Sequence, residues 1–499
     1  MRKTHRPTTV VALILSLFMA ALEATVVSTA MPTVVGDLGG IQIYSWVFTA
    51  YLLTSTVTVP IYGKLADLYG RKPIILFGIA LFLVGSIASG VSRSMTQLIA
   101  FRALQGLGAG AMQPMAITIV GDIFSLEERG RMQGLFGAAW AVAGLVGPMA
   151  GGVIVHYLSW HWIFFINIPF GIAAAILLVI ALHEPIEKKP HILDIAGASL
   201  LTACVTALLF ATTGASLLIT LGGLAASAVL FLIFASVEKK APEPVLPFTI
   251  FKKPVIAVSS VAGALIGGAM FATMTYVPLF VQGVLGGSPT DAGSAVTPMV
   301  IGWPVASAIS GRLIMRMGYR PLIRGGLGLT AAASIVLAIF ASRTESLWLP
   351  RVATLFFGVG LGLANTALLI AVQTSVDWAQ RGIVTASTMF VRTIGGALAI
   401  GVTGGVLRMA LARDSSIPPD AASQLLGPER GQHLDPEVVR HLGAALESGV
   451  GIIFWISCAI ACAAFLSSLL FPRVSLKEGA EVAAAPSPEA DRSELKEPV

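Results

Sequence analysis

Long apolar segments recur along almost the whole chain, and they constrain its fold more than any other feature of the sequence. Of the 499 residues, 56% are hydrophobic and only 12% are charged, which is about half the charged fraction of an ordinary soluble domain. A fold surrounded by water cannot hide that much apolar surface behind so few charges. The composition therefore predicts an integral membrane protein. It excludes a secreted disulfide scaffold, a nucleic-acid-binding protein and an ordinary cytosolic enzyme.

A helix that crosses the hydrocarbon core of a bilayer, which is about 30 Å thick, needs about 20 apolar residues. Fourteen segments of the chain have that length and composition. We therefore predict an all-α polytopic membrane protein with 14 transmembrane helices. The predicted spans lie near residues 8–31, 44–62, 73–91, 95–120, 133–157, 161–182, 195–214, 216–237, 255–282, 293–315, 322–342, 348–372, 384–407 and 450–471.

Lys and Arg are unevenly distributed among the connections between these segments. The short odd-numbered connections carry only Arg93, Arg343 and Arg351, whereas the N-terminus and the even-numbered connections carry most of the other basic residues. Basic residues are retained on the cytoplasmic side of a membrane. Both termini are therefore predicted to be cytoplasmic, in a multi-pass protein of the plasma (inner) membrane. The net charge of +6 has the same origin and requires no nucleic-acid partner.

The chain contains an internal repeat. Residues 63–73 and 311–321 align without a gap at an offset of 248 and share Gly, Leu, Gly, a basic residue and Pro. Two further pairs support this register: Pro32 with Gly39 and Gly40 resembles Pro278 with Gly286 and Gly287, and Arg102 with Gly108 and Gly110 resembles Arg351 with Gly358 and Gly360. Spans 1–6 are therefore predicted to be a parallel copy of spans 9–14, with spans 7 and 8 inserted as a hairpin. Such duplicated halves are typical of transporters.

The repeat divides the chain into predicted units. These are an N-terminal six-helix half (1–190), an inserted helix pair (191–240), a C-terminal six-helix half (241–475) and a cytoplasmic tail (476–499). A long external loop, 408–449, belongs to the C-terminal half. The tail is rich in Ala, Pro and Glu and is predicted to be disordered.

Five stretches carry motifs that resemble those of the major facilitator superfamily. Residues 102–108 resemble its span-4 motif, and residues 144–152 resemble the span-5 motif associated with antiporters. Residues 22–32 and 160–169 are similar to the span-1 motif and the start of span 6 in its fourteen-helix drug:proton antiporter branch. The stretch 63–72 resembles the cytoplasmic motif of the superfamily, with the defining positions Gly63, Asp67, Gly70, Arg71 and Lys72.

This resemblance covers about residues 8 to 471. It implies the major facilitator fold and multidrug efflux by drug:proton antiport, with small amphipathic compounds and protons as the transported species. One position departs from the branch, which usually has Asp in span 1 where this chain has Glu23. The carboxylate is kept, while its reach differs.

Glu23 lies deep in an apolar segment, with Arg102 predicted to be its partner. A carboxylate inside a membrane is energetically unfavourable and marks a candidate functional site. Apolar surroundings disfavour the charged form of a carboxyl group, so such a residue can bind and release protons. At a rise of 1.5 Å per residue, Arg102 in span 4 lies within about 3 Å of the same depth. In the family this Arg is linked to proton transfer; the alternative is an ion pair that only ties helices together.

Two motifs have predicted mechanical roles. In residues 63–72, Asp67 would cap a helix or pair with a base, and Arg71 and Lys72 would latch the two halves when the protein opens outward. Met315 replaces the acid in the second copy. The alternative is a tight turn whose basic residues only set the topology.

In span 5, small residues allow close helix packing, and a proline removes one of the backbone hydrogen bonds of the helix. The resemblance associates this motif with control of proton leak. The alternative is a close-packed helix without a coupling role; the residues are Gly144, Gly147, Pro148, Gly151 and Gly152.

Polar or aromatic residues in mid-span are candidates for the lining of a cavity. A cavity with one carboxylate among Met, Phe and Trp side chains suits lipophilic cations, through charge and cation–π contact. For each candidate the alternative is an interhelical hydrogen bond or, for the arginine, helix packing. The candidates are Tyr51, Gln105, Gln113, Asn365, Gln373 and Arg392.

The first functional interpretation is a monomeric, proton-coupled antiporter that exports amphipathic or cationic compounds by alternating access. The second is an exporter of a lipid or metabolite, or an inward proton symporter, with loop 408–449 as a lid or docking surface. An enzyme or a metal site is not expected, because His, Asp and Cys do not cluster at one depth. A channel is disfavoured by the duplicated halves. No Gly-x-x-x-x-Gly-Lys-Ser/Thr loop is present, so no cofactor is expected and a proton gradient, not ATP, should supply the energy.

Overall fold

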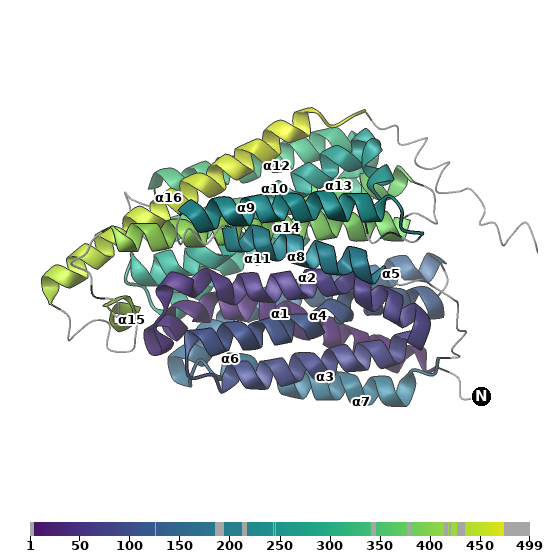
Figure 1. Ribbon diagram of the computed structural model, residues 1–499, viewed down its shortest axis with the longest axis horizontal. Coiled ribbons are helices and arrows are strands. Elements are labelled where there is room, and N and C mark those ends of the chain that lie inside the picture. The colour runs from purple at the N-terminus through teal and green to yellow at the C-terminus, as the bar shows by residue number, and fades with distance from the viewer. Residues whose placement is uncertain are drawn as a thin grey trace, which may run out of the picture.

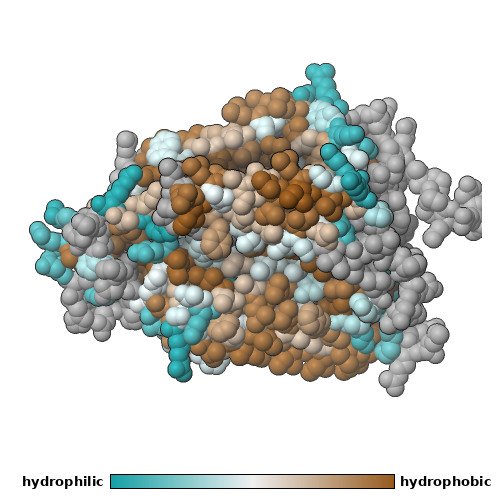
Figure 2. All heavy atoms as spheres, viewed as in Figure 1, coloured by the Kyte–Doolittle hydropathy of each residue, from teal (hydrophilic) through white to brown (hydrophobic). Residues whose placement is uncertain are grey.

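The computed structural model describes residues 4–124, 126–184, 194–211, 217–242, 244, 246–340, 346–376, 381–413, 418, 421–426 and 435–473. Within these ranges the structure is helical and contains no strand. Eleven of the helices there are long and apolar enough to cross a membrane. Figure 2 shows hydrophobic residues along the flank of the molecule and hydrophilic residues gathered toward its two ends, the distribution that a bilayer favours.

The helices fall into three groups along the chain. The first group consists of α1 (Arg6–Leu38), the 3-10 turn η1 (Ile41–Ile43), α2 (Tyr44–Tyr69), α3 (Arg71–Gly90), α4 (Met95–Ile123), α5 (Leu126–Tyr157), α6 (Trp162–Phe165) and α7 (Asn167–Ala181). Next come α8 (Ile195–Ala211) and α9 (Leu217–Glu238), which pack against each other. The last group consists of η2 (Phe248–Lys252), α10 (Pro254–Gly283), α11 (Pro289–Met317), α12 (Tyr319–Phe340), α13 (Trp348–Thr374), α14 (Arg381–Ala412), α15 (Ala421–Leu426) and α16 (Pro436–Leu469).

The same packing pattern occurs twice along the chain. In the first group, α1 packs against α5 and α7, and both α2 and α3 pack against α4. In the last group, α10 packs against α14 and α16, and both α11 and α12 pack against α13. The most extensive contacts between the groups are α5 with α11 and α2 with α14, which correspond to each other in the repeat, and α1 also contacts α10, α11 and α15. Figure 1 shows α1, α3 and α7 on one side of the molecule and α10, α12 and α16 on the other.

Glycines at the helix crossings show that α13 is displaced by one turn relative to α4. Gly108 in α4 lies against Gly78 in α3, and Gly360 in α13 lies against Gly326 in α12. Gly78 and Gly326 are separated by 248 residues, whereas Gly108 and Gly360 are separated by 252. The four additional residues correspond to about one helical turn.

This displacement corrects the sequence comparison that paired Arg102 with Arg351. Arg102 Nε donates to the carbonyl of Val47 in α2 at 3.4 Å. At the matching place in the second copy, Thr354 Oγ1 donates to the carbonyl of Ala295 in α11 at 2.7 Å. Thr354 therefore occupies the position of Arg102, and the second copy carries no arginine there.

The predicted span at 161–182 is interrupted near its beginning. α6 ends at Phe165 and α7 begins at Asn167. Pro169 has no N–H, and its ring would clash with the carbonyl of Phe165 in a continuous helix. Next to this break, the carbonyl of Phe164 accepts a hydrogen bond from Ser86 Oγ in α3, at 2.8 Å.

The predicted external loop 408–449 is helical over much of its described part. α14 continues to Ala412, and α16 begins at Pro436 because Asp435 caps it, with Oδ1 accepting from the N–H of Glu437 at 2.8 Å. Figure 1 shows α16 extending beyond the bundle, with α15 beside the same end. α15 packs against α1, α10 and α16. The other residues of this loop and the predicted tail 476–499 lie outside the described residues.

Candidate functional site

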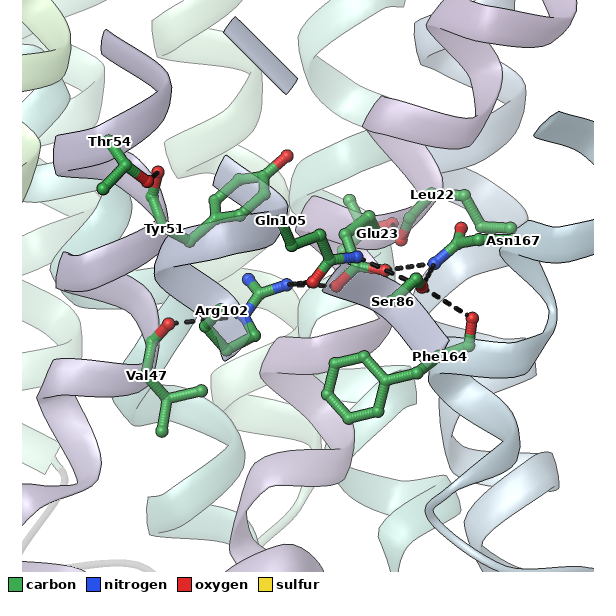
Figure 3. Close-up of polar contacts among 11 residues, drawn as sticks. Leu22, Glu23, Val47, Tyr51, Thr54, Ser86, Arg102, Gln105, Phe164 and Asn167 are labelled. Atoms are coloured by element: carbon green, nitrogen blue, oxygen red, sulfur yellow. Dashed lines mark hydrogen bonds and ion pairs between the residues drawn. The ribbon is translucent and has the colours of Figure 1, made fainter. Parts of the chain in front are cut away.

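Glu23 and Arg102 form an ion pair inside the first group of helices. Glu23 Oε1 accepts from Arg102 Nη1, and the two residues are only 1% and 2% exposed (Figure 3). The same Nη1 donates to Gln105 Oε1 at 2.6 Å. The guanidinium also lies over the ring of Tyr51, 4.2 Å from its centroid. The structure thus brings together the two residues that were predicted to share one depth.

The second oxygen of Glu23 belongs to a hydrogen-bond network that joins α1, α3, α4 and α7. Asn167 Nδ2 donates to Glu23 Oε2 and also to Ser86 Oγ at 3.0 Å (Figure 3). Gln105 Nε2 donates to the same Ser86 Oγ at 3.2 Å. Glu23 is therefore held by a cation on one side and an amide on the other.

Asn167 and Ser86 were not among the predicted site residues. Asn167 had a detectable signal, since it is an amide in an apolar run just before Pro169. Ser86 had none, because a serine in an apolar helix is common and usually bonds to its own backbone.

Arg102 and Tyr51 form part of the wall of a cavity. The cavity lies among α1, α2, α4 and α10, so helices of both groups enclose it. Phe48, Phe271 and Met274 also line it. The buried ion pair is thus adjacent to a space with aromatic and thioether walls.

The other predicted lining residues lie elsewhere. Gln105 is buried within the ion-pair network, and Gln113 is partly buried in α4. Gln373 Nε2 donates to Thr385 Oγ1 at 3.2 Å, and Arg392 Nη1 donates to Asn365 Oδ1 at 3.0 Å. None of these five residues lines the cavity beside Arg102.

The contacts described for Arg71 and Lys72 lie within the first group of helices. Arg71 Nε pairs with Asp122 at the end of α4 at 3.2 Å, and the N–H groups of Arg71 and Lys72 each donate to the carboxylate of Glu184 at 3.0 Å. Lys72 Nζ donates to the carbonyl of Leu182 at 2.7 Å. These contacts tie the start of α3 to the ends of α4 and α7. The side chain of Asp67 lies outside the described residues, and the latch between the two halves remains a prediction.

Gly70 permits the turn between α2 and α3. Its φ is 92° and its ψ is 155°, a region essentially restricted to glycine. Gly318 ends α11 in the matching way, with φ 76° and ψ −178°. Gly63 has ordinary helical geometry, and no atom of the described residues lies within 4 Å of a Cβ placed on it.

We expect Gly70→Ala to destabilise the protein by about 1–3 kcal/mol, because alanine would be strained in this conformation. The thermal unfolding midpoint of the protein in detergent should fall accordingly. Gly63→Ala is the control and should leave the midpoint unchanged or raise it. Equal midpoints for the two variants would contradict the role given to Gly70.

The glycines of α5 face two different helices. A Cβ on Gly147 or Gly151 would overlap the hydroxyl of Thr25 or Thr29 in α1. A Cβ on Gly152 would lie 2.8 Å from the carbonyl oxygen of Pro289 in α11.

Two more contacts complete the packing of α5. Thr25 Oγ1 donates to the carbonyl of Ala143 in α5 at 3.3 Å. A Cβ on Gly144 would overlap the side chain of Val300 in α11, and the carbonyl of Pro148 lies against Gly293 in α11. Through these glycines, α5 packs both on the helix that carries Glu23 and on the other group of helices.

Comparison with known proteins agrees with this architecture. Residues 13–400 match the family model described as Major Facilitator Superfamily. The chain is 39% identical to Multidrug transporter protein MdtP of Bacillus subtilis (strain 168), over 81% of this chain and 76% of that protein. It is 35% identical to Multidrug resistance protein 3 of the same organism, over 80% of this chain and 78% of the relative. Among solved structures, a bacterial homologue of the human lysosomal transporter Spinster, in an inward-facing and unoccupied conformation, matches with a TM-score of 0.69 and 16% identity, over 96% of this chain and 99% of that one.

Proposed function

Because the chain belongs to the Major Facilitator Superfamily, a family of transporters and not of enzymes, we propose that it is a proton-coupled antiporter. In this proposal it exports amphipathic and cationic compounds from the cytoplasm across the plasma membrane. The two Bacillus subtilis relatives named as multidrug proteins support this class of substrate.

The observation that carries the proposal is that Arg102, the ion-pair partner of Glu23, forms part of the wall of the cavity. When Glu23 is charged, it neutralises Arg102, and the wall of the cavity has no unpaired positive charge at this point to repel a cation. When Glu23 gains a proton, Arg102 keeps its charge without a counter-ion, and the cavity repels a cation. A proton and a cationic compound therefore favour different states of one site, which is the requirement for exchange.

The cavity walls suit the apolar part of such a compound. Phe48, Tyr51 and Phe271 provide ring faces, and Met274 provides a flexible thioether. Rings attract cations through their π-electrons, and methionine adapts to apolar groups of varied shape. This combination favours breadth of substrate over selection of one compound.

The proposed membrane arrangement has 14 spans with both termini cytoplasmic. The eleven helices identified by length and hydropathy include α6 and α7 together as one interrupted span. Three further helices, α2, α4 and α8, bring the number of spans to 14. Residues 1–190 and 241–475 then form the two six-helix halves, with residues 191–240 as the inserted pair. The protein would work as a monomer, without a cofactor, and draw its energy from the proton gradient.

Ethidium efflux tests the proposal. Cells that produce the protein should expel preloaded ethidium faster than cells with an empty vector, and an uncoupler should remove the difference. Efflux that persists with the uncoupler would contradict proton coupling. The absence of efflux would contradict this substrate class and favour export of a lipid or metabolite.

A further inference from the structure

Arg392 is a second arginine in the middle of a long helix, and its surroundings differ from those of Arg102. It lies in α14, and its Nη1 donates to Asn365 Oδ1 in α13 at 3.0 Å. In the part of the chain that the structure describes, no carboxylate pairs with it. A guanidinium in an apolar setting needs a counter-charge, since its desolvation is otherwise uncompensated.

The contrast with Arg102 shows what is missing around Arg392. Arg102 is sealed by a carboxylate, an amide, a carbonyl and a ring face. A guanidinium has five N–H donors, and for Arg392 the described contact engages a single nitrogen. Arg392 and Asn365 are also both partly exposed, so neither is sealed within the packing.

The backbone around Arg392 leaves space for its side chain. A Cβ on Gly267 in α10 would overlap the carbonyl of Arg392 and lie 2.9 Å from its Cγ. The glycine thus lets the stem of the arginine lie against α10. One turn farther along α14, Gly396 packs against the ring of Phe271, which lines the cavity beside Arg102. Arg392 therefore lies four residues, about one helical turn or ~6 Å along the helix axis, from a residue that contacts the cavity wall.

We propose that Arg392 and Asn365 form a subsite for a carboxylate carried by a transported amphipathic compound. The guanidinium supplies charge-assisted donors. Asn365 accepts from Arg392 through Oδ1, which directs its Nδ2 donor to the second oxygen of the carboxylate. The inference rests on the proposed transport function and extends its substrate class from cations to zwitterions. A zwitterion would place its cationic part against the rings of Phe48 and Tyr51 in the cavity and its carboxylate near Arg392.

A matched pair of dyes tests the subsite. A rhodamine with a free carboxylate is a zwitterion, and its methyl ester is a cation of nearly the same shape. Both are titrated by fluorescence anisotropy into the purified full-length protein in phosphatidylcholine nanodiscs, without a proton gradient. Arg392→Gln is expected to weaken binding of the zwitterion by about tenfold or more, as loss of a charge-assisted hydrogen bond does. Binding of the ester should change by less than about twofold.

Two further variants make the result specific. Arg392→Lys keeps the charge and should restore part of the affinity for the zwitterion. Arg324→Gln removes an arginine that donates to the carbonyls of Ser468 and Leu469, and it should leave both affinities unchanged.

Several outcomes would overturn the subsite. These are the absence of zwitterion binding by the wild type, an equal loss of affinity for both dyes, and no loss for either. Displacement of the zwitterion by phosphatidylglycerol in the wild type alone would assign the site to a lipid headgroup instead. Because the titration needs no gradient, a protein that binds both dyes with the expected selectivity but exports no ethidium supports the subsite and contradicts the proposed export of cationic compounds.

Discussion

Replacing Glu23 with glutamine is expected to remove uncoupler-sensitive ethidium efflux, with initial rates falling at least about tenfold toward those of cells that lack the protein. Glutamine keeps the size of the side chain and the oxygen that accepts from Asn167. It cannot exchange a proton, and it cannot neutralise Arg102. The measurement is the rate of efflux from preloaded cells, normalised to the amount of protein in the membrane.

Two matched variants sharpen this result. Glu23→Asp keeps the carboxylate and shortens its reach by one methylene, so it should retain part of the efflux and all of its sensitivity to the uncoupler. Asp37→Asn changes another acid on α1, whose Oδ2 accepts from Trp160 Nε1 at 2.7 Å, and should leave coupling intact. Unchanged, uncoupler-sensitive efflux in Glu23→Gln would rule out Glu23 as the coupling carboxylate.

Loss of coupling must be separated from loss of stability. Breaking a buried ion pair on one side costs about 3–5 kcal/mol, because the remaining charge is left without a partner. Glu23→Gln should therefore lower the thermal unfolding midpoint, and the double variant Glu23→Gln/Arg102→Gln should recover much of it. Efflux should stay absent in the double variant. Recovery of efflux together with stability would show that the pair is only structural.

The second large effect is expected from Gly152→Leu. The new Cβ would lie 2.8 Å from the carbonyl oxygen of Pro289 and from the Cα of Thr290. Both are backbone atoms, so the contact is relieved only if α5 and α11 separate at this end. In the proposed alternating-access cycle these helices approach and separate, so efflux should fall about tenfold or more and the separated state should accumulate.

Distance measurements between spin labels test this directly. Tyr157 and Trp348 are 75% and 71% exposed. Tyr157 is the last residue of α5, close to Gly152, and Trp348 is the first residue of α13. Labels on these positions should move apart in Gly152→Leu. Gly137→Leu alters the same helix where no atom of the described residues lies within 4 Å of the new Cβ, and should keep the wild-type distance. An unchanged distance in Gly152→Leu would contradict the assigned role of the α5–α11 contact.

Much of this architecture follows from the sequence because membrane helices are constrained so strongly. A fixed rise per residue places Glu23 and Arg102 at one depth, and the structure pairs them. The rotation of each helix about its axis has no comparable sequence signal. Asn167, at the start of α7, donates to Glu23, and no pattern in the sequence shows that it faces this way; Ser86 carries no pattern at all.

The error in the repeat has a related cause. A comparison based on glycines aligned Arg102 with Arg351, whereas the packing shows that Thr354 is the residue equivalent to Arg102 in the second copy. Glycine recurs at several positions on both α4 and α13, so more than one register matches. Only the neighbour of each glycine distinguishes between them, and that neighbour belongs to another helix.

The ion pair occurs in the first copy of the repeat and, among the described residues, not in the second. This determines which part of the membrane's electrochemical energy the exchange can use. The second copy has Thr354 where the first has Arg102, so the exchange at this pair involves the single carboxylate of Glu23. One proton inward for one monovalent cation outward moves no net charge, so the difference in pH alone would drive it. A zwitterion carries no net charge, and its exchange for one proton would also draw on the voltage, at about 2.3 kcal/mol per 100 mV. The two substrate classes would thus respond differently when the membrane is depolarised at constant pH.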